Sequence, residues 1–213
     1  MDSRRGEVDA MRLTRAESKA ANRRALIDAA REVVGKEGSQ AKLEHIAELA
    51  GLTTGAVYSL FGGKNDLMVA MVEDYTGPLD LRPIEDCGPG LSLEEVVAEV
   101  ARRFQRMSAD PDAVGRLLFE TRVLDLVLND PELLGKLNAS IRSTEVGLAA
   151  LFTGREHDGA PVTEEQAVRL ARALKGLLSG LGQSVVLGVH EGSEEFFVDV
   201  AHALITPKVL GPA

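Results

Sequence analysis

A short stretch near the N-terminus, GLTTGAVYSLFGGK at residues 51–64, gathers side chains that suit contact with nucleic acid. Thr53, Thr54 and Ser59 offer hydroxyl groups, and Tyr58 offers a ring tipped by a hydroxyl. Such groups form hydrogen bonds with base edges and phosphates when a helix enters the major groove of DNA. The stretch is therefore a candidate DNA-binding site.

Two further residues of this stretch break local rules of helix formation. Gly55 lies inside a predicted helix, where glycine costs about 1 kcal/mol relative to alanine. Lys64 starts the next predicted helix, at the end where a positive charge is disfavoured. Residues that break such rules are concentrated at functional or strained positions. A bare backbone at Gly55 would let DNA approach, and a phosphate at the helix N-terminus would offset the placement of Lys64.

The elements that must position these residues have the spacing of a helix-turn-helix. Ala47 and Gly51 are four residues apart, so the small side chain allows a close helix crossing and the glycine allows a left-handed turn. Four apolar residues are spaced to fill the joint between the two helices: Ile46, Leu52, Val57 and Leu60. The Ala-x-x-x-Gly spacing alone fits an ordinary helical hairpin equally well.

Helical periodicity along the whole chain predicts an all-α protein, with no convincing strand. The predicted helices are 18–36, 42–50, 54–60 and 64–76, then, after a Pro- and Gly-rich segment at 76–91, 92–107, 111–128, 131–152, 163–190 and 193–204. We expect a flexible basic arm at 1–17, a helix-turn-helix domain at 18–63, a connecting helix at 64–76 and a larger helical effector-binding and dimerisation domain at 77–213.

The distribution of charge permits contact with DNA although the net charge is −9. Residues 11–31 hold six basic residues against Glu17 and Asp28, which gives +4 in that segment. A basic leading edge on an acidic protein favours specific over non-specific DNA contact. His45 falls on the outer face of the second predicted helix, where contact with the DNA backbone and plain solvent exposure are both open.

Other function classes find little support in the sequence. The single Cys87 excludes an intrachain disulfide framework and fits a reducing compartment, and no apolar run of about 18 residues could span a membrane. We therefore expect a cytoplasmic protein. No nucleophile triad, phosphate loop or pair of catalytic carboxylates stands out, so neither an enzyme nor a cofactor is expected. His190 and Glu194 have the spacing of half a metal site, but we expect no metal.

At this point the sequence resembles a known family. The string G-L-T-T-G-A-V-Y-S-L-F-G-G-K-N-D-L is similar to the DNA-binding signature of the tetracycline-repressor (TetR) family, over about residues 18–75. The resemblance implies an all-helical homodimer with a three-helix DNA-binding domain and a larger domain that binds a small-molecule effector and releases double-stranded operator DNA.

Where the residues match the family motif, the resemblance implies that the recognition helix begins with Thr53, Thr54 and Gly55. It also implies that Tyr58 and Lys64 contact phosphates. Phe61 matches a packing position. The chain departs from the family where Ala41-Lys42 replaces the usual Ser or Thr before the second helix, so we expect Lys42 to reach a phosphate there and Gln40 or Ser39 to act as the cap. The predicted DNA-binding set is Lys42, His45, Thr53, Thr54, Gly55, Tyr58, Ser59 and Lys64.

The second half of the chain predicts a dimer interface and a ligand cavity. An apolar stripe on helix 163–190, with residues of the last helix, predicts dimer contacts at Leu170, Leu174, Leu177, Leu178, Leu181, Phe196 and Val200. Packing of this stripe onto its own core is the alternative. The predicted ligand-binding residues are Phe104, Met107, Leu117, Phe119, Glu120, Arg122, Val123, Leu126, Gln183 and Ser184.

The sequence therefore predicts a ligand-responsive transcriptional regulator, most simply a repressor, that binds a palindromic operator as a dimer. Two alternatives stay open: a DNA-binding protein that needs no effector, and a helical ligand carrier. The sequence names neither the effector nor the operator.

Overall fold

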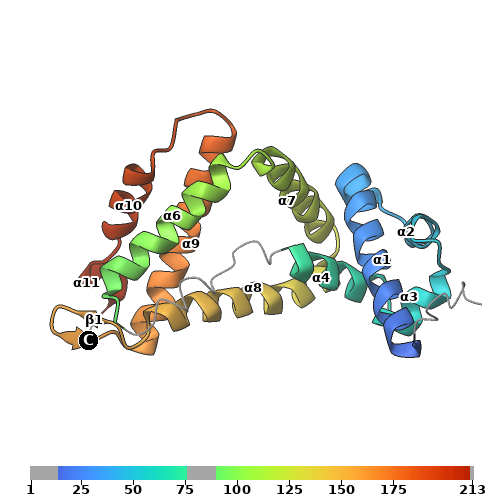
Figure 1. The fold of residues 1–213 in the computed structure, drawn as a ribbon, viewed down its shortest axis with the longest axis horizontal. Helices are drawn as coiled ribbons and strands as arrows, with labels where there is room; N and C mark the ends of the chain where they lie inside the picture. The colour runs from blue at the N-terminus through green and yellow to red at the C-terminus, as the bar shows by residue number, and fades with distance from the viewer. Residues whose placement is uncertain (1–13, 76–89, 212–213) are drawn as a thin grey trace, which may run out of the picture.

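The computed structural model describes residues 14–75 and 90–211, and these are almost entirely helical (Figure 1). The predicted all-α fold is confirmed. The predicted linker at 76–91, apart from its last two residues, and Cys87 lie outside the described residues. No helix of the described ranges is both long and apolar enough to cross a membrane.

The N-terminal part consists of α1 (Arg15–Glu37), a short 3-10 turn η1 (Gly38–Gln40), α2 (Leu43–Leu49), α3 (Thr54–Phe61) and α4 (Lys64–Tyr75). We call residues 15–75 the head. Helix α1 begins three residues earlier than predicted because Thr14 and Glu17 form a reciprocal capping box, which satisfies free N–H groups of its first turn.

The remainder consists of α6 (Leu93–Ala109), α7 (Ala113–Leu128), α8 (Pro131–Phe152), α9 (Glu164–Val186), α10 (Glu194–His202) and α11 (Pro207–Leu210). The predicted capping boxes of α6 and α9 are present. Helix α11 was not predicted, although Thr206 caps it and Pro207 occupies its first position, a common arrangement at helix starts.

The prediction that no strand exists was wrong in one small place. Strands β1 (Glu156–His157) and β2 (Ala160–Pro161) form an antiparallel hairpin. The two residues between them, Asp158 and Gly159, have φ of 51° and 78°. A two-residue hairpin turn of this kind requires positive φ at both positions, and Asp-Gly is a favoured pair there.

Two hydrophobic cores hold the described residues together, and they do not divide at the predicted boundary of 77. The head core contains buried residues of α1 to α4, and also Phe119, Leu126 and Val127 from α7 and Leu133 and Leu137 from α8. The body core contains residues of α6, α9, α10 and α11 and the end of α8, such as Leu148 and Phe152.

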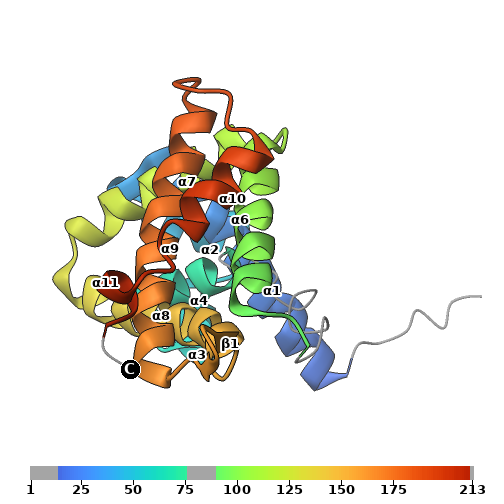
Figure 2. The same cartoon turned by 90° about the vertical axis from the view of Figure 1, so that its left-hand side faces the viewer.

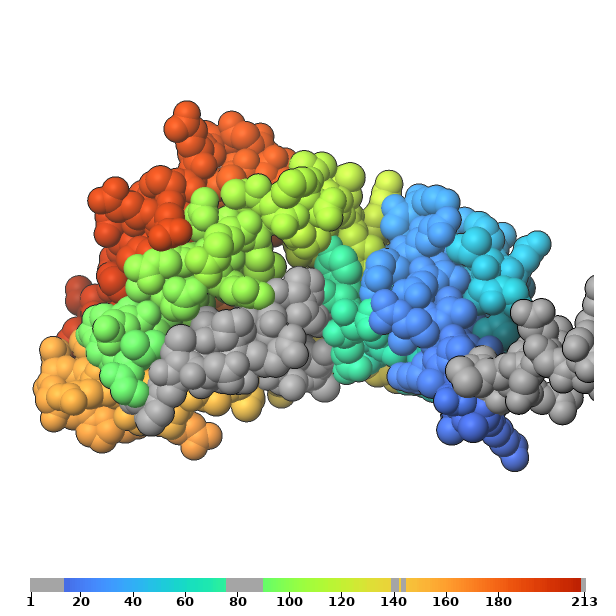
Figure 3. Space-filling view, viewed as in Figure 1, coloured from blue at the N-terminus to red at the C-terminus, as the bar shows by residue number. Residues whose placement is uncertain are grey.

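Helices α7 and α8 therefore join the head to the body. In Figure 1 they form an upper and a lower connection between the head on one side and α6, α9 and α10 on the other. The space-filling view shows the same order along the molecule, from the blue head through the yellow-green residues of α7 to the orange and red residues of the body (Figure 3). The domain boundaries predicted from sequence remain a prediction.

Candidate DNA-binding surface and ligand pocket

The turn between α2 and α3 has the geometry of a helix-turn-helix. Gly51 has φ of +67°, a left-handed conformation that glycine adopts at little cost. The chain then folds back so that the Leu52 N–H donates to the Ala47 carbonyl at 2.9 Å. Ile46 and Val57 are fully buried and fill the joint. Thr53 caps α3 by accepting the Ala56 N–H at 3.3 Å. The joint forms from the residues that the sequence indicated.

Helix α3 turns its polar face to solvent. The Tyr58 side chain is 60% exposed, Thr53, Gly55 and Ser59 are also exposed, and Thr54 is half-buried. A Cβ built at Gly55 would meet nothing closer than Thr53 Oγ1, at 3.6 Å. Because alanine would fit there, packing within the protein does not explain the glycine.

Lys64 has a structural contact that the sequence did not indicate. Its Nζ donates to the Ala41 carbonyl at 2.6 Å, which fixes the start of α4 against the segment before α2. Neither Ser39 nor Gln40 caps α2, whose N-cap residue is Lys42 and which has no side-chain cap. Ser39 instead donates its backbone N–H to Asp125 of α7. That expectation was wrong because η1 turns Ser39 toward α7.

The exposed cations near α3 fall into two groups. Arg24 and Arg31 both pair with Asp74 of α4. Arg23 donates to the Leu60 carbonyl at 3.3 Å and lies 4.2 Å over the Phe61 ring, so Phe61 is a packing residue as expected.

The second group consists of cations that form no ion pair, side-chain hydrogen bond or ring contact within the described residues: Arg15, Lys19 and Lys42. His45 is exposed, and its Nδ1 lies 2.7 Å from Glu37 Oε1. Three of the described cations, Arg15, Lys19 and Lys42, are therefore free to contact an anion. Lys64 and His45 already contact Ala41 and Glu37.

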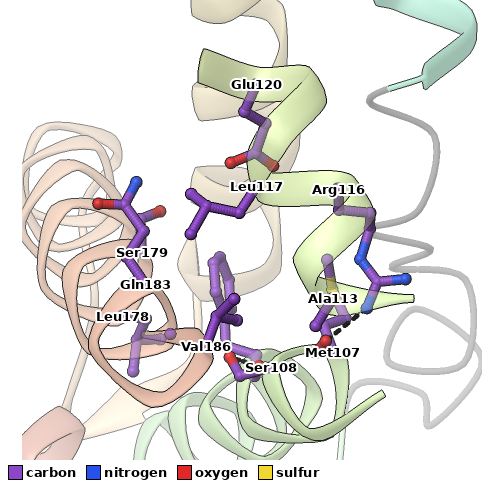
Figure 4. A pocket seen from close by; sticks show the side chains of 12 residues that line it. Met107, Ser108, Ala113, Arg116, Leu117, Glu120, Leu178, Ser179, Gln183 and Val186 are labelled. Atoms are coloured by element: carbon purple, nitrogen blue, oxygen red, sulfur yellow. Dashed lines mark hydrogen bonds between the residues drawn. The ribbon is translucent and has the colours of Figure 1, made fainter. Parts of the chain in front are cut away.

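A cavity of about 100 Å³ lies between α6, α7 and α9 (Figure 4). Five predicted ligand-binding residues come together around it: Phe104, Met107, Leu117, Glu120 and Gln183. The other lining residues were not predicted to bind a ligand: Ser108, Ala113, Arg116, Leu178, Ser179, Gly182 and Val186. One usable signal was Gly182, where a Cβ would lie 2.6 Å from Ser108 Oγ, so the glycine lets α6 approach α9 beside the cavity.

The other five predicted ligand-binding residues lie away from this cavity. Phe119 and Leu126 are buried in the head core and Val123 packs against it, because they occupy the opposite face of α7. Arg122 lies beside Gly38, and Ser184 donates its hydroxyl to the Gly180 carbonyl. Spacing along the sequence did not distinguish the two faces of α7, since both are apolar.

Of the two charged side chains that line the cavity, only Arg116 has hydrogen-bond partners among the described residues. Arg116 donates to Asp110 Oδ1 at 3.2 Å and to the Met107 carbonyl at 2.5 Å, which holds its guanidinium at the corner between α6 and α7. Glu120 forms no hydrogen bond or ion pair with any described residue. Although its side chain reaches solvent, desolvation by its surroundings raises the pKa of the Glu120 carboxyl, against the opposing effect of Arg116.

The far face of α7 is fixed to the head by polar and aromatic contacts. Asp125 Oδ2 accepts the Ser39 N–H at 2.9 Å, and this hydrogen bond lowers the pKa of the Asp125 carboxyl. A Cβ on Gly38, whose φ is +56°, would lie only 2.7 Å from the same oxygen. The rings of Phe119 and Tyr75 pack against each other with centroids 4.1 Å apart and planes tilted by 46°. Burial, and then the charge of Glu120, raise the pKa of Tyr75 to about 12.

The predicted dimer stripe is only partly at the surface. Leu170, Leu174 and Leu178 are fully buried in the body core, so the prediction that they contact a partner subunit is contradicted. Leu177, Leu181 and Val200 are half-buried, and Phe196 is 44% exposed. The alternative, in which the stripe packs onto its own core, holds for three of its leucines.

The proposed half of a metal site does not assemble. Glu194 pairs with Arg102 at 3.2 Å, and the His190 ring lies edge-on to Phe196 with centroids 5.8 Å apart. Within residues 14–75 and 90–211, no three His, Cys, Asp or Glu side chains gather where they could hold a metal ion.

A helix-turn-helix head joined to a larger all-helical body with a partly open cavity is an arrangement suited to a DNA-binding transcriptional regulator. Comparison with known proteins agrees. The family described as "Bacterial regulatory proteins, tetR family" matches residues 26–71. Residues 26–71 therefore carry a DNA-binding domain like that of the TetR family of transcriptional regulators.

Individual relatives support this assignment. The HTH-type transcriptional regulator SrpR of Pseudomonas putida is 42% identical over 87 residues, which are 40% of this chain and 40% of SrpR. The fatty acid metabolism regulator protein of Bacillus subtilis (strain 168) is 28% identical over 87% of this chain and 93% of its own. The crystal structure of the multidrug binding protein EbrR complexed with malachite green is 26% identical with a TM-score of 0.62, and the match covers 86% of this chain and 98% of EbrR.

Proposed function

We propose that this regulator is a repressor, which binds a palindromic operator as a homodimer and leaves it when a small molecule enters the cavity between α6, α7 and α9. The observation that carries the proposal is the double role of α7. One face of this helix lines the cavity with Leu117 and Glu120, and the other buries Phe119 and Leu126 in the head core.

DNA contact is assigned to the exposed face of α3 and to the uncommitted cations around it. Thr53, Thr54 and Gly55 open the helix that would enter the major groove, and Tyr58 and Ser59 lie farther along it. We assign phosphate contacts beside the groove to Arg15, Lys19 and Lys42, because they pair with no carboxylate among the described residues. Lys64 holds Ala41 with one N–H, and because an ammonium has three donors, it also keeps capacity for a phosphate.

Dimerisation is assigned to the outer surface of α9 and α10. The two helices lie side by side at the end of the molecule opposite the head (Figure 2). A Cβ built on Gly176 or Gly180 would meet no atom within 4 Å, so this surface of α9 is flat and open to another helix. Leu177, Phe196 and Val200 are at least partly exposed there and are the apolar contacts that we propose.

Release of DNA requires that the effector bind one arrangement of the protein better than another. A molecule larger than the cavity of about 100 Å³ would displace α7 from α9. Because Asp125 and Phe119 tie α7 to η1 and α4, this displacement would move the head and change the separation of the two recognition helices. Crystal structures of EbrR complexed with proflavin and with ethidium support a small-molecule site in a body of this fold.

The test is selection of bound duplexes from a random DNA pool at physiological salt. We expect a palindrome whose half-sites are about 34 Å apart along the duplex, since two recognition helices must reach successive major grooves. An effector should then lower operator affinity at least about fivefold. If the folded dimer enriches no sequence, the DNA-binding part of the proposal is wrong; if no ligand changes operator affinity, the effector part is wrong.

A further inference from the structure

We infer that the cavity between α6, α7 and α9 takes a small organic cation, a protonated amine that carries an apolar group of about one ring, with Glu120 as its counter-ion. This inference rests on the proposed effector site and adds the chemical class of its ligand.

The cavity lining contains one charged side chain that forms no hydrogen bond or ion pair with a described residue, the carboxylate of Glu120. Two ionisable side chains, Arg116 and Glu120, contribute to its lining. The Arg116 guanidinium already donates to Asp110 and to the Met107 carbonyl, and Figure 4 shows it turned toward the corner of α6 and α7. Glu120 has no such partner in the described ranges. Arg116 offsets the charge of Glu120 only through space, without a hydrogen bond, so a cation beside this partly exposed carboxylate gains further electrostatic free energy.

The neighbouring polar groups can accept hydrogen bonds from an ammonium. Ser179 and Gln183 project from α9 opposite Glu120 of α7 (Figure 4). Ser108 donates its hydroxyl hydrogen to the Phe104 carbonyl at 2.8 Å, so its oxygen remains an acceptor. Hydroxyl and amide oxygens accept hydrogen bonds, and an ammonium only donates them. The oxygens of Ser179, Gln183 and Ser108 can therefore accept from an ammonium, and the preference for a cation over an anion comes from the charge of Glu120.

The rest of the wall sets the size and character of the ligand. Phe104, Leu117, Leu178 and Val186 make most of the surface apolar. A closed cavity of about 150 Å³ is enough to hold benzene. The present cavity of about 100 Å³ is smaller but partly open, so a single ring with a short ammonium arm would reach the carboxylate while pressing α7 away from α9, as the proposed release of DNA requires.

The experiment is calorimetric titration of the full-length protein, without DNA, with three probes of similar shape: benzylamine, benzyl alcohol and benzoate. At pH 7 benzylamine is a cation and benzoate an anion. We expect benzylamine to bind about tenfold more tightly than benzyl alcohol, since a hydrogen bond to a charged group is worth that much, and benzoate to bind most weakly.

The deciding variant is Glu120→Gln, which keeps the shape of the side chain and removes its charge. It should weaken benzylamine about tenfold and leave benzyl alcohol within about twofold. Glu165→Gln, at the exposed start of α9 and outside the cavity lining, is the matched control and should change neither. An unchanged preference for benzylamine in Glu120→Gln, or tighter binding of benzoate by the unmodified protein, would overturn the inference.

Two outcomes separate this inference from the proposed function. If benzyl alcohol or benzoate binds and releases operator DNA while benzylamine does not bind, the effector site stands and its assignment to cations is wrong. If none of the three probes binds, the ligand class is wrong as stated, and operator selection without ligand still decides whether the head binds DNA.

Discussion

The recognition helix α3 and the cavity between α6, α7 and α9 are built on different principles. The polar face of α3 comes from one continuous segment of about ten residues, whose shape is set by Gly51, the Thr53 cap and the buried Val57. The cavity takes its walls from three helices spread over residues 104–186. A site encoded locally can be identified from a motif, whereas a site made by distant packing depends on which face each helix buries.

The largest effect that we expect tests whether α7 belongs to the head as well as to the cavity. Phe119→Ala removes a ring that is only 7% exposed and packs against Tyr75, so it should lower the free energy of unfolding by about 3–5 kcal/mol. Leu118→Ala, one residue away and 62% exposed, is the matched control and should change it by less than about 0.5 kcal/mol. Urea denaturation of both variants measures the difference. Equal, small losses would mean that α7 is not part of the head core.

Much of the fold could be predicted because its signals are local. The capping boxes at Ser92 and Thr163 and the Asp130-Pro131 pair placed the starts of α6, α9 and α8. The hairpin at Asp158-Gly159 was missed because each of its strands has two residues, too few for alternation to show. The sequence could not predict that α8 is shared between the two cores or that α7 lies between the head core and the cavity. Helical periodicity indicates that a helix has an apolar face, but not which element covers that face.

The second prediction separates base reading from phosphate binding on α3. Thr54→Ala should change which base is preferred at one operator position, by about 1–3 kcal/mol, because a base-edge contact carries sequence information. Tyr58→Phe removes a hydroxyl assigned to a phosphate, so it should weaken all sequences by a similar factor. Duplex selection with each variant measures both effects. A sequence preference that Thr54→Ala leaves unaltered would remove Thr54 from the base-reading set.

The third prediction separates the effect of Gly55 on the stability of the fold from its effect on DNA binding. Gly55→Ala should raise the free energy of unfolding by up to about 1 kcal/mol, because alanine is a better helix former and its Cβ meets nothing closer than 3.6 Å. The same change should weaken operator binding, since the added methyl group lies where the duplex approaches. Thermal melting and DNA titration of one sample give both values. Greater stability with undiminished DNA affinity would place Gly55 away from the DNA.

The candidate sites were predictable to different degrees for the same physical reason. On the cavity side, five of the ten predicted residues line its wall, and the other five lie elsewhere because the two faces of α7 are similarly apolar. The leucines of α9 show the same limit, since Leu170, Leu174 and Leu178 proved to be core. The hydrogen bond from Lys64 to the Ala41 carbonyl joins residues that are 23 positions apart, so no local sequence signal could predict it.

The smallest effect concerns the hydrogen bond by which α7 holds η1, and its sign depends on pH. The Ser39 N–H lowers the pKa of Asp125 in the folded state, so the ionised carboxylate contributes stability above its unfolded pKa, and this contribution is lost as the pH falls through the folded pKa. Asp125→Asn should therefore unfold at lower urea concentration than the unmodified protein at pH 7, and the gap should close toward pH 3. Asp112→Asn, at an exposed carboxylate directly before the first residue of α7, serves as the control and should show no such closing gap. A gap that stays constant with pH would mean that the Asp125 carboxylate does not hold η1 through its charge.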